Sequence, residues 1–195
     1  DGEEGRFVAS SIFESKMRNQ YKNKDFVILY RTNAQSRAFE DSLRKKNIPY
    51  RVYGGLSFYQ RKEIKDILAY LRLIVNNSDE EAFKRIINFP ARGIGQTSID
   101  KLIIESKQRK TTIYDVAKNI NEFSLSIGLK IRNKINDFVL SIEKAKLMLK
   151  ESNAFEITEE VIKLSGIYKL YKDEESLESI NRIQIIEELL NGVQD

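Results

Sequence analysis

Apolar residues recur along most of this chain at spacings of three and four, which is the period of an amphipathic helix. Segments with this pattern occupy residues 6–20, 34–46, 58–73, 80–89, 113–118, 129–150, 155–164 and 177–191, and a further helix begins at Gln96. The segments are long enough for ordinary globular helices, and Pro90 supplies a stop signal after the fourth. The pattern therefore predicts a mainly α-helical protein.

Two short runs near the N-terminus have a different pattern. Residues 25–30 and 48–53 are rich in β-branched and aromatic side chains and are too short for a helix. The first run is continuously apolar after its aspartate, which is typical of a strand buried on both faces. With the helix at 34–46 between them, the two runs predict a small strand-helix-strand (βαβ) unit with a right-handed crossover.

A turn with two glycines joins the predicted helices at 80–89 and 96 onward. Gly93 and Gly95 flank Ile94, and glycine lets a backbone turn sharply and come close to a ligand because it has no Cβ. The helix that begins at Gln96 would present unpaired N–H groups and the positive end of its dipole to the same ligand. Phosphate fits this description. A tight turn without any ligand is an equal alternative, because short glycine motifs recur by chance.

Composition narrows the function classes. The chain has 195 residues, of which 41% are hydrophobic, so it can build a core. It has neither cysteine nor histidine, which excludes disulfides and thiolate metal sites and removes the most common general base. No apolar run approaches the roughly 20 residues of a membrane span, and no signal segment opens the chain. We therefore expect a cytoplasmic protein with no membrane partner.

Charge is distributed unevenly. Residues 1–55 carry 11 Lys and Arg against 7 Asp and Glu, and residues 56–135 carry 15 against 9. Residues 136–195 carry 7 against 13, so the basic excess surrounds the glycine turn and the last third is acidic. This distribution favours a polyanion as the partner of the first two thirds, and a solvated or protein-facing surface for the last.

Two longer blocks resemble a known family. Residues 30–37, YRTNAQSR, and residues 54–66, GGLSFYQRKEIKD, resemble conserved blocks of the UvrD, PcrA and Rep family of superfamily 1A ATP-dependent DNA helicases. The likeness continues through residues 69–72, 88–95, 165–167 and 182–190. The helix-turn-helix layout around the glycines also resembles the helix-hairpin-helix element that many DNA-binding proteins place against a duplex backbone.

The resemblance implies a domain organisation. Such helicases have two RecA-like motor domains, 1A and 2A, each interrupted by an inserted helical domain, 1B and 2B. Residues 1–55 are similar to the start of 2A, and residues 56–195 are similar to the 2B insertion. ATP and Mg²⁺ then belong to the motor of the parent helicase. The chain has no G-x-x-x-x-G-K-[ST] loop, so we expect no cofactor and no metal site here, no catalytic residue, and no ATP hydrolysis by this chain alone.

The resemblance also assigns roles to residues. Tyr30, Arg31 and Asn33 match the block that lines the single-strand track of 2A, where an aromatic ring can stack on a base and polar side chains can hold phosphate. The structural alternatives are that Tyr30 caps the sheet and that Asn33 caps the next helix. Contact with a duplex backbone is expected from the turn and its neighbours. These residues are Arg92, Gly93, Ile94, Gly95, Gln96 and Thr97, with Arg92 supplying a charge and Thr97 a hydroxyl.

The function that follows is the DNA-binding and regulatory portion of an ATP-dependent 3'-to-5' DNA helicase of repair or replication. Its expected partners are duplex and single-stranded DNA, the motor domains of the parent chain, and repair proteins. The alternative is a protein-interaction module that restrains the same helicase, and the acidic last third favours it as an added role.

Overall fold

The computed structural model describes residues 2–53 and 55–194, and it is helical over most of both ranges. Its α-helices are α1 (Gly2–Asn19), α2 (Ser36–Lys45), α3 (Lys62–Val75), α4 (Glu80–Ile86), α5 (Gln96–Arg109), α6 (Ile113–Lys118), α7 (Leu129–Leu147), α8 (Ala154–Ser165), α9 (Ile167–Glu174) and α10 (Leu177–Gln194). Four short 3-10 helices are η1 (Asn23–Asp25), η2 (Asn33–Gln35), η3 (Phe58–Gln60) and η4 (Met148–Lys150). The prediction of a mainly α protein is confirmed. None of the described helices combines the length and the apolarity that crossing a bilayer requires.

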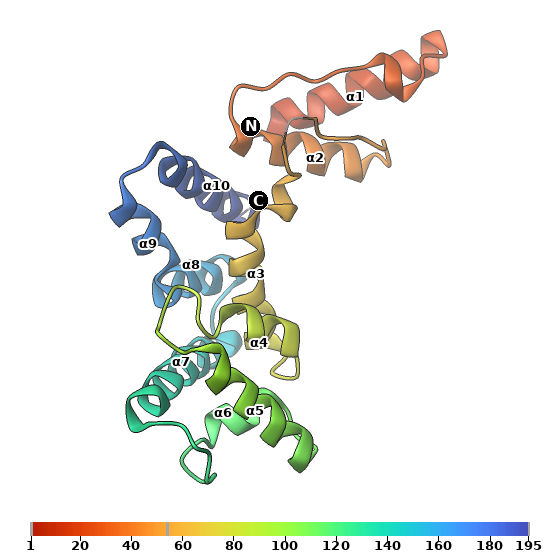
Figure 1. The fold of residues 1–195 in the computed structure, drawn as a ribbon. Coiled ribbons are helices and arrows are strands. Elements are labelled where there is room, and N and C mark those ends of the chain that lie inside the picture. The colour runs from red at the N-terminus through yellow and green to blue at the C-terminus, as the bar shows by residue number, and fades with distance from the viewer. Residues whose placement is uncertain (1, 54, 195) are drawn as a thin grey trace.

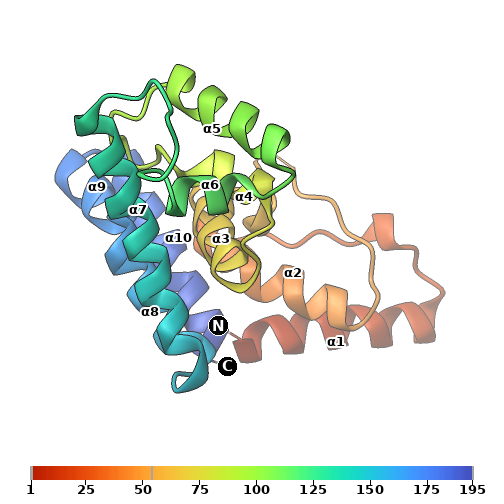
Figure 2. The same cartoon turned by 90° about the horizontal axis from the view of Figure 1, so that it is seen from below.

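Helix α3 lies in the middle of the larger, helical part of the molecule. It packs against α4, α7, α8 and α10, and Figures 1 and 2 show it surrounded by these helices. Its residues at helical spacing, among them Ile64, Ile67 and Leu73, are fully buried. The core beside them contains edge-to-face aromatic contacts, including Phe83 with Phe138 at 5.8 Å between ring centroids. The helical part therefore has one continuous core organised around α3.

Helices α1 and α2 form a smaller unit at one end of the molecule, and α5 to α7 lie toward the opposite end (Figure 1). The small unit has its own apolar cluster of Ala9, Ile12, Leu43 and Ile48. A Cβ on Gly5 would lie 2.4 Å from the carbonyl oxygen of Ala38 in α2, so only glycine allows this approach of the two helices.

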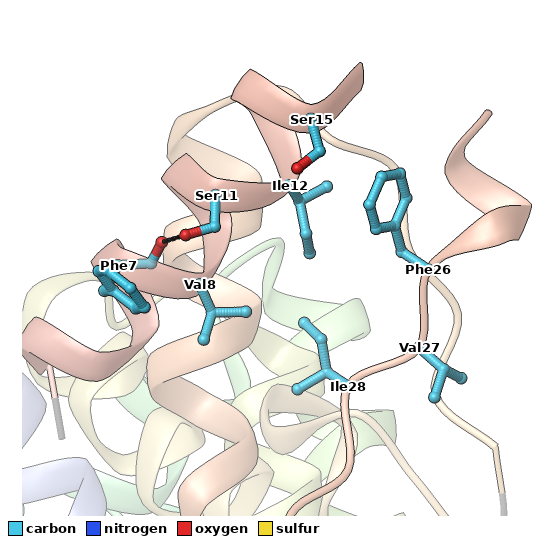
Figure 3. A pocket seen from close by; sticks show the side chains of 8 residues that line it. All are labelled: Phe7, Val8, Ser11, Ile12, Ser15, Phe26, Val27 and Ile28. Atoms are coloured by element: carbon cyan, nitrogen blue, oxygen red, sulfur yellow. Dashed lines mark hydrogen bonds between the residues drawn. The ribbon is translucent and has the colours of Figure 1, made fainter. Parts of the chain in front are cut away.

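The predicted strand-helix-strand unit is wrong, because the described residues contain no β-strand. Residues 26–30 are extended, but only one face is covered: Phe26 and Ile28 turn toward Val8 and Ile12 of α1, whereas Val27 turns away and is 78% exposed (Figure 3). Residues 48–52 have no regular secondary structure and Tyr53 is a bend, so the second run is not a strand either. The pattern placed both runs outside the helices, but neither pairs with another strand in the described chain, and no sheet forms.

The prediction of a helix-hairpin-helix element is not supported. The turn does join two helices, but α4 ends at Ile86 rather than near residue 89, and residues 87–95 connect it to α5. Helix α4 packs against α3 and α6, whereas α5 packs mainly on α6. The two helices beside the turn therefore do not form a closely packed pair. A second departure is α9, which the sequence pattern missed: α8 ends at Gly166 in a left-handed conformation and a new helix starts at once.

A buried ion pair connects the small unit to the end of the chain. Arg37 Nε of α2 donates to Glu188 Oε1 of α10 at 2.8 Å, and both side chains are less than a tenth exposed. Gly192 lies directly under the guanidinium, since a Cβ there would be 2.3 Å from Arg37 Nη1. A second link is Glu40, whose carboxylate accepts the Phe58 backbone N–H at 2.9 Å and the Tyr50 hydroxyl at 2.9 Å. These contacts set how α1 and α2 sit on the helical part.

Replacing a core residue of α3 should destabilise the protein strongly. We expect Ile67→Ala to lower the free energy of unfolding by about 2–5 kcal/mol, because a fully buried side chain leaves a cavity. Leu29→Ala is the control: this side chain is 87% exposed, and we expect a change within about 0.5 kcal/mol. Urea denaturation followed by circular dichroism measures both. Equal losses for the two variants would contradict the assignment of the core.

A carboxylate between α6 and α7 should make stability depend on acid pH. Burial by itself raises the pKa of Glu143, but hydrogen bonds from Tyr114 (2.6 Å), Lys118 (3.0 Å) and Lys146 (3.3 Å) outweigh it and lower that pKa to about 2. Because the unfolded value is about 4.3, the stabilisation is complete above about pH 5 and is lost as the pH falls toward 2. The difference in melting temperature between the parent and Glu143→Gln should therefore be largest near neutral pH and shrink toward pH 2. A difference that stays constant over this range would contradict the prediction.

Candidate nucleic-acid interface

The glycine turn is shaped by one asparagine side chain. Asn88 Oδ1 accepts the backbone N–H of Arg92 at 3.0 Å and that of Ile94 at 2.9 Å. Ile94 is completely buried, and Gly93 has φ of +72°, a left-handed conformation that favours glycine. The turn is thus fixed from its inner side.

Arg92 directs its guanidinium inward. Its Nη1 donates to the carbonyl oxygen of Ile86 at 3.0 Å, and its Nη2 donates to the Tyr70 hydroxyl at 2.6 Å and reaches the carbonyl oxygen of Ser165 at 3.4 Å. The guanidinium carbon also lies 5.2 Å from the ring centroid of Phe138. These bonds join the ends of α4 and α8, and the Ile86 carbonyl also accepts the backbone N–H of Phe89 at 3.1 Å. A phosphate contact by Arg92, which the sequence predicts, would have to displace them.

The outer side of the turn presents backbone. Gly93, Gly95, Gln96 and Thr97 are all exposed. In the described part of the chain, the N–H groups of Gly95, Gln96 and Thr97 have no acceptor, as is usual for the first turn of a helix. The Gln96 side chain donates to Asp100 at 2.9 Å, whereas the Thr97 hydroxyl has no partner among the same residues. The predicted residues are therefore brought together on one exposed surface, except for the side chains of Ile94 and Arg92.

Lys134 is a neighbour of the turn that the sequence pattern did not identify. It lies on α7, and its Nζ is so close to Gly93 that a Cβ on that glycine would be 2.8 Å away. No spacing along the chain links residues 93 and 134, so only the packing of α7 could place this ammonium beside the turn.

The predicted single-strand residues lie at the start of α2, apart from the glycine turn. The Tyr30 ring is half-buried and stacks on Phe39 at 6.3 Å between centroids, so one of its faces is occupied by the protein. Gln35 Oε1 accepts the backbone N–H of Arg31 at 2.9 Å, which leaves the exposed Arg31 side chain directed outward. Asn33 begins η2, whose N-cap position is Thr32, so Asn33 is not the cap residue.

The residues at the glycine turn do not match those of a loop that binds ATP and Mg²⁺. Gln96 and Thr97 follow Gly95 where a phosphate-binding loop has lysine and then serine or threonine, and a helix precedes the turn instead of a strand. In the described ranges no three Asp or Glu side chains gather where a metal ion could bind.

Arg92→Ala should reduce stability. Removing the guanidinium takes its hydrogen bonds away from the carbonyl oxygens of Ile86 and Ser165 and from the Tyr70 hydroxyl, and we expect a loss of about 1–3 kcal/mol in the free energy of unfolding. Arg92→Lys should recover little of it, because one ammonium cannot reproduce the planar fork. Arg31→Ala, which removes an exposed arginine, is the matched control and should change little. Thermal denaturation of the three variants checks this, and an Arg92→Ala as stable as Arg31→Ala would show that the inward bonds do not support the turn.

An exposed glycine turn at the N-terminus of a helix can accept a negatively charged group. Comparison with known sequences shows which class of protein this chain belongs to. All 195 residues match the UvrD-like helicase C-terminal domain, and the chain belongs to that family.

Its relatives are DNA helicases. The chain is 37% identical over 188 residues to the ATP-dependent DNA helicase PcrA of Bacillus subtilis, which covers 96% of this chain and 25% of the relative. It is 38% identical over 193 residues to DNA helicase II of Haemophilus influenzae, with 99% and 26% covered. It is also 38% identical over 196 residues to PcrA of Staphylococcus aureus, again with 99% and 26% covered. The chain thus spans about a quarter of the length of these proteins.

Proposed function

We propose that this chain is the DNA-binding and regulatory portion of an ATP-dependent 3'-to-5' DNA helicase of repair or replication. Residues 1–55 are then the beginning of motor domain 2A, and residues 56–195 are the inserted domain 2B. The proposal is supported by the family and by relatives whose names state an ATP-dependent DNA helicase. The duplex backbone is contacted through the turn that contains Gly93, Ile94 and Gly95, and by Gln96 and Thr97.

Gly95 is the observation that best supports the duplex contact. Its φ of −72° and ψ of 158° are ordinary for any residue, and a Cβ at this position would have no atom within 4 Å. The described protein therefore does not itself require glycine at position 95. A molecule that comes close to the backbone from outside would require it, because a side chain would block access to the free N–H groups.

The single-strand contact is the second part of the proposal. Arg31 is exposed and free to meet phosphate, and Asn33 lies two residues further along the same surface of the small unit. Tyr30 already stacks on Phe39, so it offers at most its edge or its second face to a base. The extended, half-covered segment at residues 26–30 beside α1 would be completed by the rest of 2A in the parent protein.

Gly95→Val tests the duplex contact without disturbing the fold. The backbone conformation suits valine, but Gly95 is the N-cap of α5, where valine is less favourable than glycine, so we expect a small loss of stability that the control below shares. We expect duplex affinity to fall roughly tenfold or more, because the branched side chain denies phosphate one or two charge-assisted hydrogen bonds. Fluorescence anisotropy with two unrelated duplex sequences, each at several salt concentrations, measures the change. Both sequences should be affected equally, since phosphate is the same at every base pair.

Gly128→Val is the matched control. Gly128 occupies the N-cap position of α7 with φ of −64° and ψ of 149°, and a Cβ there also has no atom within 4 Å. It should bind duplex as the parent does. Parent-like binding by a folded Gly95→Val, or an equal loss in both variants, would show that the turn is a connector and not the contact.

A protein-interaction role is the second candidate. The last third of the chain is acidic, and Leu177 and Ile180 on α10 are 87% and 50% exposed, which is favourable for a protein partner. Absence of duplex binding by the parent chain would favour this role over the first.

A further inference from the structure

We infer that Lys134 of α7 is the charged member of the duplex contact and neutralises the phosphate that the N–H groups of the glycine turn approach. The inference rests on the proposed function and adds a residue to it. The sequence pattern had given this charge to Arg92, which the structure directs inward.

Lys134 occupies the space that a side chain at position 93 would take. A Cβ on Gly93 would lie 2.8 Å from Lys134 Nζ, so the ammonium rests directly against the backbone of the turn. Helix α7 is fixed at this level by Ile135, which is completely buried in the core. A packed helix, and not a loop, therefore holds the ammonium beside the turn.

The charges around Lys134 favour the binding of an anion. In the described part of the chain its ammonium has no ion pair or hydrogen bond, whereas Lys144 and Lys146 of the same helix pair with Glu160 at 2.9 Å and Glu143 at 3.3 Å. Lys134 is half-buried, and the turn beside it leads into the N-terminus of α5, the positive end of that helix dipole. A phosphate bound at this turn would interact favourably with both the helix N-terminus and the unpaired ammonium.

Because residue 134 is a lysine, its contact with phosphate would depend on charge and not on geometry. An ammonium is a compact point charge without the planar fork that lets arginine read a guanine edge or grip a phosphate with two parallel bonds. Charge is then the property that matters, so arginine should replace Lys134 with little loss. The contact should also be indifferent to the base sequence.

The experiment measures duplex affinity against salt for the parent, Lys134→Gln, Lys134→Arg and Lys144→Gln. We expect Lys134→Gln to raise Kd about threefold to tenfold and to make the slope of log K against log salt shallower by about 0.9, the effect of one phosphate contact. Lys134→Arg should keep the parent slope. Lys144→Gln makes the same change of charge about 15 Å further along α7 and should also keep the parent slope.

The outcomes separate this inference from the proposed function. Duplex binding by the parent together with an unchanged Kd and slope in Lys134→Gln would overturn the inference and leave the proposed function standing. Equal losses in Lys134→Gln and Lys144→Gln would overturn it too, because the effect would then be one of net charge. A parent that binds no duplex would overturn both. Melting temperatures of all four proteins should agree. A stability loss in both Lys134→Gln and Lys134→Arg that is absent from Lys144→Gln would assign Lys134 a structural role and overturn the inference.

Discussion

The need to satisfy backbone carbonyl groups in the loops organises the helical part of this protein. Arg92 is the main example, because its guanidinium bonds the end of α4, the Tyr70 hydroxyl of α3 and the last residue of α8. Arg132 does the same for the loop before α7, where it donates to the carbonyl oxygens of Ile120 at 2.7 Å and Leu125 at 2.6 Å. Both arginines use their fixed fork of donors to hold irregular backbone, which would otherwise carry unpaired polar groups.

This use of arginine explains how the turn can be both rigid and available. Its inner side is held by Arg92 and by the Asn88 side chain, so the outer N–H groups keep one orientation without any ligand. A site arranged in advance loses less conformational entropy on binding than a loop that must order itself. The charge that a phosphate requires then has to come from another element, and α7 is the helix whose packing places an ammonium there.

The small unit formed by α1 and α2 is held together by different interactions. Its helices pack well on each other, but residues 26–30 cover α1 on one face only, and Val27 and Leu29 remain exposed. The buried Arg37–Glu188 pair, and Gly192 beneath it, join this unit to α10. A buried pair of this kind contributes little net stability, but loss of Arg37 would leave the buried Glu188 carboxylate without this partner, so the pair favours the observed orientation of the two parts. In the proposed function that orientation sets the relation between the single-strand block and the duplex turn.

The sequence by itself determined most of the helices and the family, because helical periodicity and the blocks shared with the family are local signals. It predicted extended backbone at residues 26–30 but could not supply strand pairing, since pairing depends on neighbours elsewhere in a chain. It also assigned the charge of the turn to Arg92, the nearest arginine along the chain. Only the tertiary structure decided that Arg92 turns inward and that Lys134, 42 positions later, lies at the turn. The direction of a long side chain depends on the carbonyl groups and helices that packing brings within its reach.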